Sequence, residues 1–136
     1  MRVFERVIED RFPAELSAYL IEHHGGARVF LPAKEPVPLR DLSRAELERL
    51  VSYGIKRAKK YGLAWKSSLT AFVAIMFEIS PNFDSVPMIA TILQTKLDQM
   101  SKIDSLMRLT NLRNWELAVA IYDPKGWLIE AERDAR

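Results

Sequence analysis

The chain has 136 residues, of which 49% are hydrophobic and 28% charged, and its formal net charge is +2. A chain of this length builds one hydrophobic core, and this composition is typical of a folded globular protein and not of a disordered one. The absence of cysteine from the sequence excludes disulfides, thiolate metal ligands and cysteine nucleophiles. We therefore expect a single helical domain over residues 1–136 that folds without a metal or cofactor.

The start of the chain, MRVFERVIEDRF, is charged at every turn and does not resemble a signal peptide. No stretch of the sequence approaches the roughly 18 consecutive apolar residues that a membrane-spanning helix needs. We therefore expect a cytoplasmic protein with no membrane contact.

Residues 2–24 are the first expected helix, because apolar side chains recur along them at helical spacing. Pro13 is expected either to kink this helix or to divide it, since proline donates no backbone hydrogen bond. The sequence HHGG at 23–26 predicts the helix end, with imidazoles near the negative pole of the dipole and glycine in the left-handed conformation. The apolar stripe consists of Val3, Val7, Ile8, Phe12, Leu16, Tyr19 and Leu20.

Residues 27–42 form an expected connector that contains three prolines, Pro32, Pro36 and Pro38. Proline denies a helix its amide donors and favours extended backbone. Strand-like alternation of side chains is convincing only over residues 28–31, which is too short to predict a sheet. Because several of its residues are apolar, we expect the connector to lie across the surface of the helices.

The strongest helix start is Ser43, because Ser43 and Glu46 have the spacing of a capping box. The helix is expected to stop at Gly62, while Gly54 within it costs about 1 kcal/mol relative to alanine and predicts close approach of a neighbouring backbone. One face of this helix is apolar and contains Leu47, Leu50, Val51, Gly54, Ile55, Ala58 and Tyr61. The opposite face or the last turn carries four cations that complement the helix dipole, Lys56, Arg57, Lys59 and Lys60.

The next segment, residues 69–79, is apolar on nearly all sides, which predicts a helix at the centre of the domain or under an interface. Ser67 or Ser68 is expected to open it. A turn follows over residues 80–84, and Asp84 or Ser85 is expected to cap the next helix.

That next helix is expected from about Val86 to Met100. A second cap over residues 101–104 predicts a further long helix that runs through Ile121 and ends at a turn over 123–126. Three residues of the tail, Trp127, Leu128 and Ile129, are expected to pack on the body, before a charged tail over residues 130–136. Together these elements predict an all-α fold, a compact single-domain bundle of five or six helices with a proline-rich extended connection after the first helical segment.

The sequence offers little catalytic chemistry. Its five glycines form no phosphate-binding loop of the usual kinds. His23 and His24 are adjacent, which places them about 100° apart around a helix and prevents easy sharing of one metal ion. The carboxylate pairs, Glu5 with Glu9 and Asp98 with Asp104, are explained more simply as solvated surface. We expect no enzyme activity, no cofactor and no metal site.

The most distinctive stretch is YGIKRAKKYG at residues 53–62, because the chain from Arg49 through Phe77 has six cations and no acidic residue. A nucleic-acid surface would combine such cations with base-reading groups, which the stretch lacks. We therefore favour a helix end that faces solvent or a protein partner, with nucleic-acid binding as the less favoured alternative.

Two aromatic residues are poorly explained by core packing: Trp65, between two expected helices, and Phe83, in an expected turn. Protein interfaces favour amphipathic aromatic anchors of this kind, and neighbouring lysines can steer an acidic partner. The predicted partner-binding surface consists of Tyr53, Arg57, Lys60, Tyr61, Trp65, Phe83 and Asp84.

The stretches YGIKRAKKYGL and FVAIMFEISPNFDSVPMIATIL together resemble small helical accessory proteins of bacterial type VI secretion effector clusters. In that pattern a helix ending in YG precedes an apolar helix, an F-D-x-x-P turn and a helix with I-L, which correspond here to residues 53–62, 72–79, 83–87 and 92–93. The resemblance covers roughly the middle third of the chain. The family pattern usually has a tryptophan after the turn, where this chain has the tripeptide MIA at 88–90.

The resemblance implies an accessory factor or chaperone that holds or loads an effector before export. Its partner would be the secreted effector or the adaptor chaperone, and the stoichiometry is left open. One alternative is an immunity protein that neutralises a cognate toxin. A further alternative, from another class, is a nucleic-acid-binding regulator.

Overall fold

The computed structural model describes the backbone of residues 2–128 and the side chains of residues 11–128. Within this range the chain forms six α-helices, which confirms the all-α class and the predicted number of helices. They are α1 (Arg2–His24), α2 (Arg44–Lys60), α3 (Lys66–Glu78), α4 (Pro87–Leu93), α5 (Gln99–Leu109) and α6 (Leu112–Ala120). The short elements are β1 (Arg28–Val29), β2 (Val37–Pro38) and three 3-10 turns, η1 (Leu39–Asp41), η2 (Phe83–Ser85) and η3 (Pro124–Trp127).

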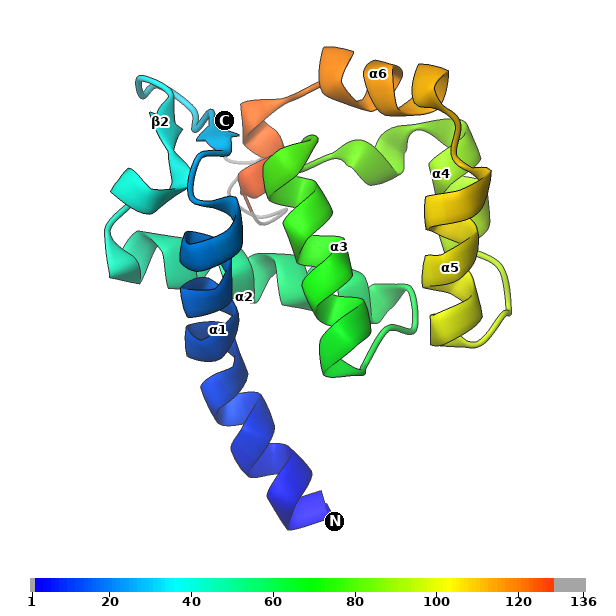
Figure 1. The fold of residues 1–136 in the computed structure, drawn as a ribbon, viewed down its shortest axis with the longest axis horizontal. Helices are drawn as coiled ribbons and strands as arrows, with labels where there is room; N and C mark the ends of the chain where they lie inside the picture. Colours follow the sequence, from blue (N-terminus) through cyan, green and yellow to red (C-terminus); the bar gives the residue numbers. More distant parts are fainter. Residues whose placement is uncertain (1, 129–136) are drawn as a thin grey trace.

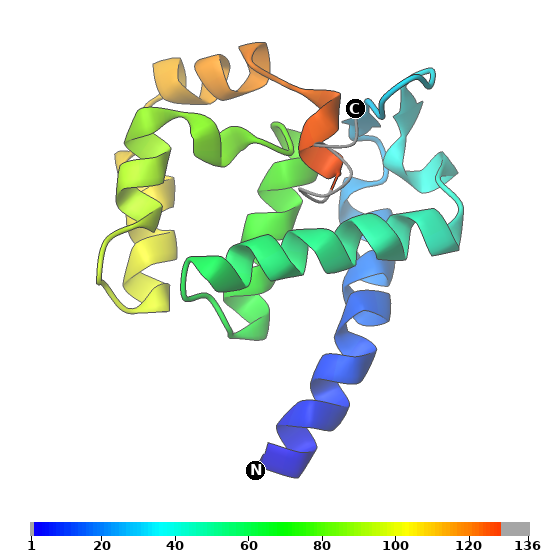
Figure 2. The same ribbon diagram turned by 180° about the vertical axis from the view of Figure 1, so that it is seen from behind.

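The helices form two layers around one core. α1 and α3 lie side by side, and α2 crosses behind both of them (Figures 1 and 2). α4 and α5 pack together at one end, and α6 passes over the top toward η3 (Figure 1). The residues buried between the layers include Leu16, Leu20, Leu47, Leu50, Val51, Phe72, Val73 and Met76.

α1 runs through Pro13 as one helix, so it is not divided there. Its buried residues Phe12, Leu16 and Leu20 confirm most of the described part of the predicted stripe, but Tyr19 is exposed, which corrects its assignment to that stripe. The helix ends at His24 as predicted. The glycines that follow have no positive φ, so the left-handed cap expected there is wrong. Instead, Gly25 provides space, because a Cβ atom there would lie 2.6 Å from the Ile21 carbonyl oxygen.

The proline-rich connector forms a minimal hairpin, in which β1 pairs antiparallel with β2. This corrects the expectation that the segment contains no sheet. Val29, Leu31 and Leu39 are buried, so the connector packs on the helices as expected. The side-chain alternation over residues 28–31 was therefore a true strand signal, although the strand is only two residues long.

Both predicted ends of α2 are confirmed. The Ser43 hydroxyl accepts a hydrogen bond from the Glu46 N–H at 3.1 Å, and Gly62 follows the helix with a left-handed φ of +84°. The Glu46 carboxylate pairs with Lys34 at 3.0 Å, so only half of the predicted capping box forms. Gly54 is buried against α3, where a Cβ atom would lie 3.1 Å from Val73 and 3.0 Å from the Met76 sulfur. The close neighbour is thus a pair of side chains and not the predicted backbone.

The predicted boundaries of the later helices need three corrections. α3 begins at Lys66, with Trp65 at the N-cap position, so Ser67 and Ser68 lie inside the helix and do not cap it as expected. α4 ends at Leu93, and a separate helix, α5, follows with Asp98 as its cap, whose carboxylate accepts the Ser101 N–H at 2.9 Å. The long helix expected to reach Ile121 is divided at Asn111, which caps α6 through the N–H of Asn114.

The segment after α6 returns to the core. Trp127 is buried and its ring centroid lies 4.6 Å from that of Phe77. Asn82 holds this segment in place, because its side chain donates to the Ile121 carbonyl and accepts from the Asp123 N–H. Burial confirms the predicted packing of Trp127 and Leu128. Ile129 and the charged tail at 130–136 lie outside the described residues.

Gly54→Leu is expected to lower the free energy of unfolding by about 1–3 kcal/mol, because the larger side chain overpacks the contact between α2 and α3. Urea denaturation of the variant measures this change. Adding Val73→Ala should recover part of the loss, since Val73 is one of the two side chains that a side chain at position 54 would contact. Lys56→Leu, an exposed change on the same helix, is the control and should stay within about 0.5 kcal/mol. An equal loss in the control would contradict the packing explanation.

Candidate protein-binding surface

Two residues of the predicted surface form a nearly buried ion pair that joins α2 to η2. The Arg57 guanidinium donates to the Asp84 carboxylate and to the Pro81 carbonyl oxygen, and the two side chains are only 13% and 8% exposed. The Tyr61 hydroxyl donates to the second oxygen of Asp84 at 2.6 Å. These bonds satisfy the charges inside the protein, so Asp84 is neither a helix cap nor an accessible partner contact.

Phe83 is completely buried, which corrects its assignment as an interface anchor. Its ring centroid lies 5.0 Å from that of Phe72, and the Tyr61 ring packs on the other side of the same cluster at 5.9 Å from Phe72. Tyr53 is half-buried beneath the Arg57 guanidinium, 5.7 Å from its ring centroid. Of the seven predicted residues, only Lys60 and Trp65 are exposed.

Three cations of α2 lie on its solvent-exposed face. Arg49, Lys56 and Lys60 are exposed there, at helical spacings of seven and four residues. The nearby carboxylates bind elsewhere, since Glu46 and Glu48 pair with Lys34 and Arg44. This face is therefore a positively charged strip within the described part of the chain.

Lys102 anchors α5 to the end of α2. Its ammonium group donates to the Tyr61 carbonyl oxygen at 2.5 Å, and the side chain is buried. A cation at this position complements the negative end of the α2 dipole. Desolvation by burial lowers the pKa of Lys102.

Trp65 is held on a fixed loop beside the start of α5. The backbone N–H groups of Ala64 and Trp65 both donate to the side-chain oxygen of Gln99 at 2.7 Å. The indole itself is 51% exposed. A large aromatic side chain on a fixed backbone loses little entropy when it is covered, so Trp65 is suited to an interface.

An apolar groove of about 410 Å³ lies between α3, α5 and α6. The small side chains of Ala71 and Ala74 leave the face of α3 open, while Met107 and Trp115 form the opposite wall. At one end the groove is bordered by His24 and Glu78, whose imidazole Nδ1 and carboxylate oxygen lie 2.6 Å apart. A polar boundary around an apolar floor is the usual anatomy of a protein-binding groove.

Met107 in the wall of this groove is exposed, and three further exposed apolar side chains on α5 and α6 are Met100, Leu109 and Leu112. We call these four residues and the groove together the α5–α6 apolar surface. Sequence reasoning missed it, because the predicted long helix did not show which of its apolar residues would face solvent. The sequence does contain an indication of this surface, because α5 and α6 have more apolar residues than one buried helix face can hold.

Among the described residues, no group of histidine, aspartate and glutamate side chains is placed to hold a metal ion. The same part of the chain has no helix that is both long and apolar enough to cross a membrane. Comparisons of the chain with protein-family models, curated proteins and solved structures return no match.

Asp84→Ala is expected to lower the free energy of unfolding by about 3–5 kcal/mol, because it leaves the Arg57 guanidinium buried without its counter-charge. Urea denaturation checks this value. The double variant Arg57→Met with Asp84→Leu should lose much less than Asp84→Ala, since no charge is then left unpaired. Glu48→Ala breaks an exposed ion pair and is the control, with an expected change within about 1 kcal/mol. A loss in the double variant as large as in Asp84→Ala would contradict this role.

Stability is expected to fall above about pH 10, where tyrosines of an unfolded chain ionise. Burial, together with the hydrogen bond to Asp84, raises the pKa of Tyr61, and burial raises the pKa of Tyr122. The folded protein therefore keeps these protons while the unfolded chain loses them. The free energy of unfolding should fall by up to about 1.4 kcal/mol per pH unit for each of the two tyrosines.

Urea denaturation between pH 8 and 11 measures this slope. Tyr61→Phe should make the slope shallower, because one of the two groups no longer titrates. A slope that Tyr61→Phe leaves unchanged would contradict the assignment to Tyr61.

Proposed function

We propose that this chain is a non-enzymatic protein-binding factor that covers its α5–α6 apolar surface with a partner protein. The observation that carries the proposal is the exposure of Met100, Met107, Leu109 and Leu112 beside an apolar groove. Several exposed apolar side chains close to an apolar groove are unfavourable in water, and we take them to mark a site of protein interaction. Methionine side chains, which adapt to differently shaped partners, contribute two of the four exposed residues.

We propose further that the chain acts as an accessory factor or chaperone that holds or loads a type VI secretion effector, together with its adaptor. This assignment rests on the resemblance over residues 53–93. The exposed methionines support it, because a factor that holds an incompletely folded client needs an adaptable apolar surface. The fixed loop with Trp65 supplies a rigid aromatic anchor next to the first turn of α5.

A triple variant, Trp65→Ala with Met107→Ser and Leu112→Ser, is expected to bind the effector encoded beside this chain at least about tenfold more weakly. The reason is that central apolar anchors carry most of the energy of an interface. Titration calorimetry with the purified partner measures the change. Ile21→Ser removes an exposed apolar side chain from α1 and is the matched control, with no expected effect. Equal affinity in the triple variant would overturn the proposed surface.

Coexpression separates the chaperone role from the immunity role. If the chain acts as a chaperone, it should raise the soluble amount and the export of the effector, and the triple variant should lose both effects. Protection of cell growth without a change in effector solubility would favour an immunity protein. A shift of DNA or RNA that weakens steeply with salt would favour a nucleic-acid-binding regulator.

A further inference from the structure

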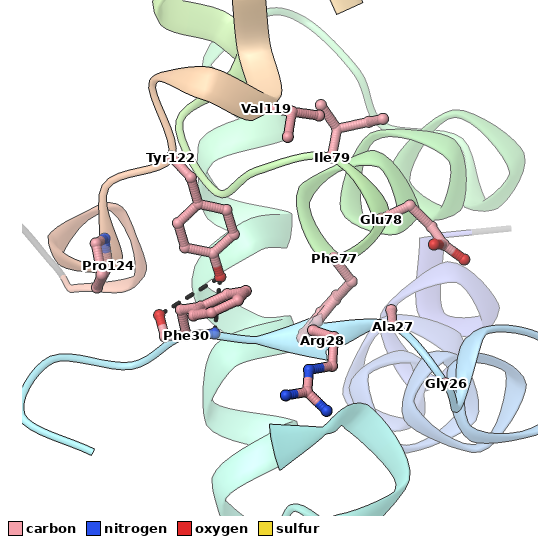
Figure 3. Close-up of a pocket in the computed structure, with 10 residues that line it drawn as sticks. All are labelled: Gly26, Ala27, Arg28, Phe30, Phe77, Glu78, Ile79, Val119, Tyr122 and Pro124. Atoms are coloured by element: carbon pink, nitrogen blue, oxygen red, sulfur yellow. Dashed lines mark hydrogen bonds between the residues drawn. The ribbon is translucent and has the colours of Figure 1, made fainter. Parts of the chain in front are cut away.

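A second hollow, of about 570 Å³, adjoins the groove at Glu78 and Ile79 and lies between β1, the end of α3 and the segment after α6 (Figure 3). Phe77 and Ile79 line it from α3, Val119 lines it from α6, and Phe30 and Tyr122 stand together on one side. Phe30 and Val119 are both exposed, so apolar walls flank the opening. The hollow is lined mainly by apolar side chains and is large enough to take a bulky apolar side chain of a ligand.

One edge of β1 faces this hollow. The strand pairs with β2 along its other edge, where the Leu39 N–H donates to the Ala27 carbonyl at 2.8 Å. Backbone groups alternate between the two edges of a strand, so the N–H and C=O groups of Arg28 and Phe30 point away from β2. In the described part of the chain, no third strand lies along this edge. An uncovered strand edge is a template for an added strand.

The Tyr122 hydroxyl limits the length of the open edge. It accepts the Phe30 N–H at 3.0 Å and lies 3.4 Å from the Phe30 carbonyl oxygen, to which it can donate (Figure 3). It also accepts the indole N–H of Trp127 at 2.8 Å, so it is fixed in place. The open backbone groups are therefore those of Arg28, directly beside the hollow.

Two guanidinium groups lie near this edge. Arg28 lines the hollow, and the Nη1 atom of Arg40 would lie 3.6 Å from a Cβ atom at Gly26, which also lines it. Neither arginine has an acidic partner among the described residues. Glu78, the carboxylate among the residues that line the hollow, lies 2.6 Å from the His24 imidazole. Arg28 and Arg40 therefore keep positive charges without an ion-pair partner in the part of the chain that the structure describes. An arginine guanidinium binds a carboxylate well through a bidentate pair of hydrogen bonds.

We propose that this hollow binds an extended peptide segment of a partner protein. The segment adds to the open edge of β1, places a bulky apolar side chain in the hollow and places a carboxylate beside Arg28. The backbone contacts give a general attraction, and the pocket and the ion pair give the specificity. The site uses none of the four exposed residues of the α5–α6 apolar surface, and it shares only Glu78 and Ile79 with the lining of the groove.

Fluorescence polarisation with labelled five-residue peptides tests the proposal. The first probe has alternating threonine and valine followed by phenylalanine and glutamate. The second probe has glutamine in place of the glutamate. The third probe has serine in place of the phenylalanine. We expect the first probe to bind most tightly, with a loss of about fivefold for the second, as for a partly exposed ion pair. Methylation of the peptide's backbone N–H groups should abolish binding, because the added strand then has no donors.

Variants of the chain locate the site. Arg28→Gln should weaken the glutamate probe about fivefold and leave the glutamine probe unchanged. Val119→Ser should weaken both probes, whereas Leu117→Ser, an exposed change on the same helix, is the control. In amide exchange measured by NMR, the Arg28 N–H should become protected when the probe binds.

Three results would overturn the proposal. The first is equal affinity for all three probes, and the second is full affinity of the methylated peptide. The third is self-association of the chain that Val119→Ser abolishes, which would show that a second copy covers the hollow. The triple variant at Trp65, Met107 and Leu112 should keep full affinity for the probe, so this test and that of the proposed function fail separately.

Discussion

The ion pair between Arg57 and Asp84 is the contact on which the rest of the fold depends. It joins residues 27 apart in the sequence and holds η2 against the last turn of α2. With η2 fixed there, Phe83 enters the aromatic cluster with Phe72, and α4 starts at a defined position at Pro87. Two nearly buried charges are unfavourable unless they are paired and hydrogen-bonded, so this contact specifies the position of η2 as much as it stabilises it.

The contacts that follow from this ion pair decide which surfaces remain uncovered. α5 returns to the end of α2, where Lys102 donates to the Tyr61 carbonyl and Gln99 accepts from the loop before Trp65. This position draws the first turns of α5 toward α2, and α6 passes over the top of the molecule (Figure 1). Since no later described helix packs over them, the outward residues of α5 and α6 stay exposed. The α5–α6 apolar surface is thus a consequence of the topology.

The sequence predicts elements whose signals are local. Ser43 and Gly62 mark the two ends of α2, because a hydroxyl cap and a left-handed glycine act within one turn of the helix. The sequence pattern predicted a helix start at Ser101. In the structure Asp98 caps the helix, and the Ser101 N–H donates to its carboxylate. The burial of Phe83 and the pairing of Asp84 could not be predicted, because the partner Arg57 lies on another helix. The candidate groove was likewise missed, since it needs three helices to be placed relative to one another.

The exposed cations of α2 lie away from the groove, which limits where they can attract a partner. Arg49, Lys56 and Lys60 are exposed on α2, on the opposite side of the helix from Gly54, which packs against α3. α2 lies in front in Figure 2, whereas α3 lies in front in Figure 1. The attraction between exposed charges falls off over about 8 Å at physiological salt, which is less than the distance across a domain. The basic strip therefore does not steer a partner into the groove, whereas the sequence pattern predicted that the lysines steer a partner to the surface around Tyr61, Trp65 and Phe83. In the proposed function, the strip therefore acts on a partner at the edge of the molecule near Trp65 and not at the groove.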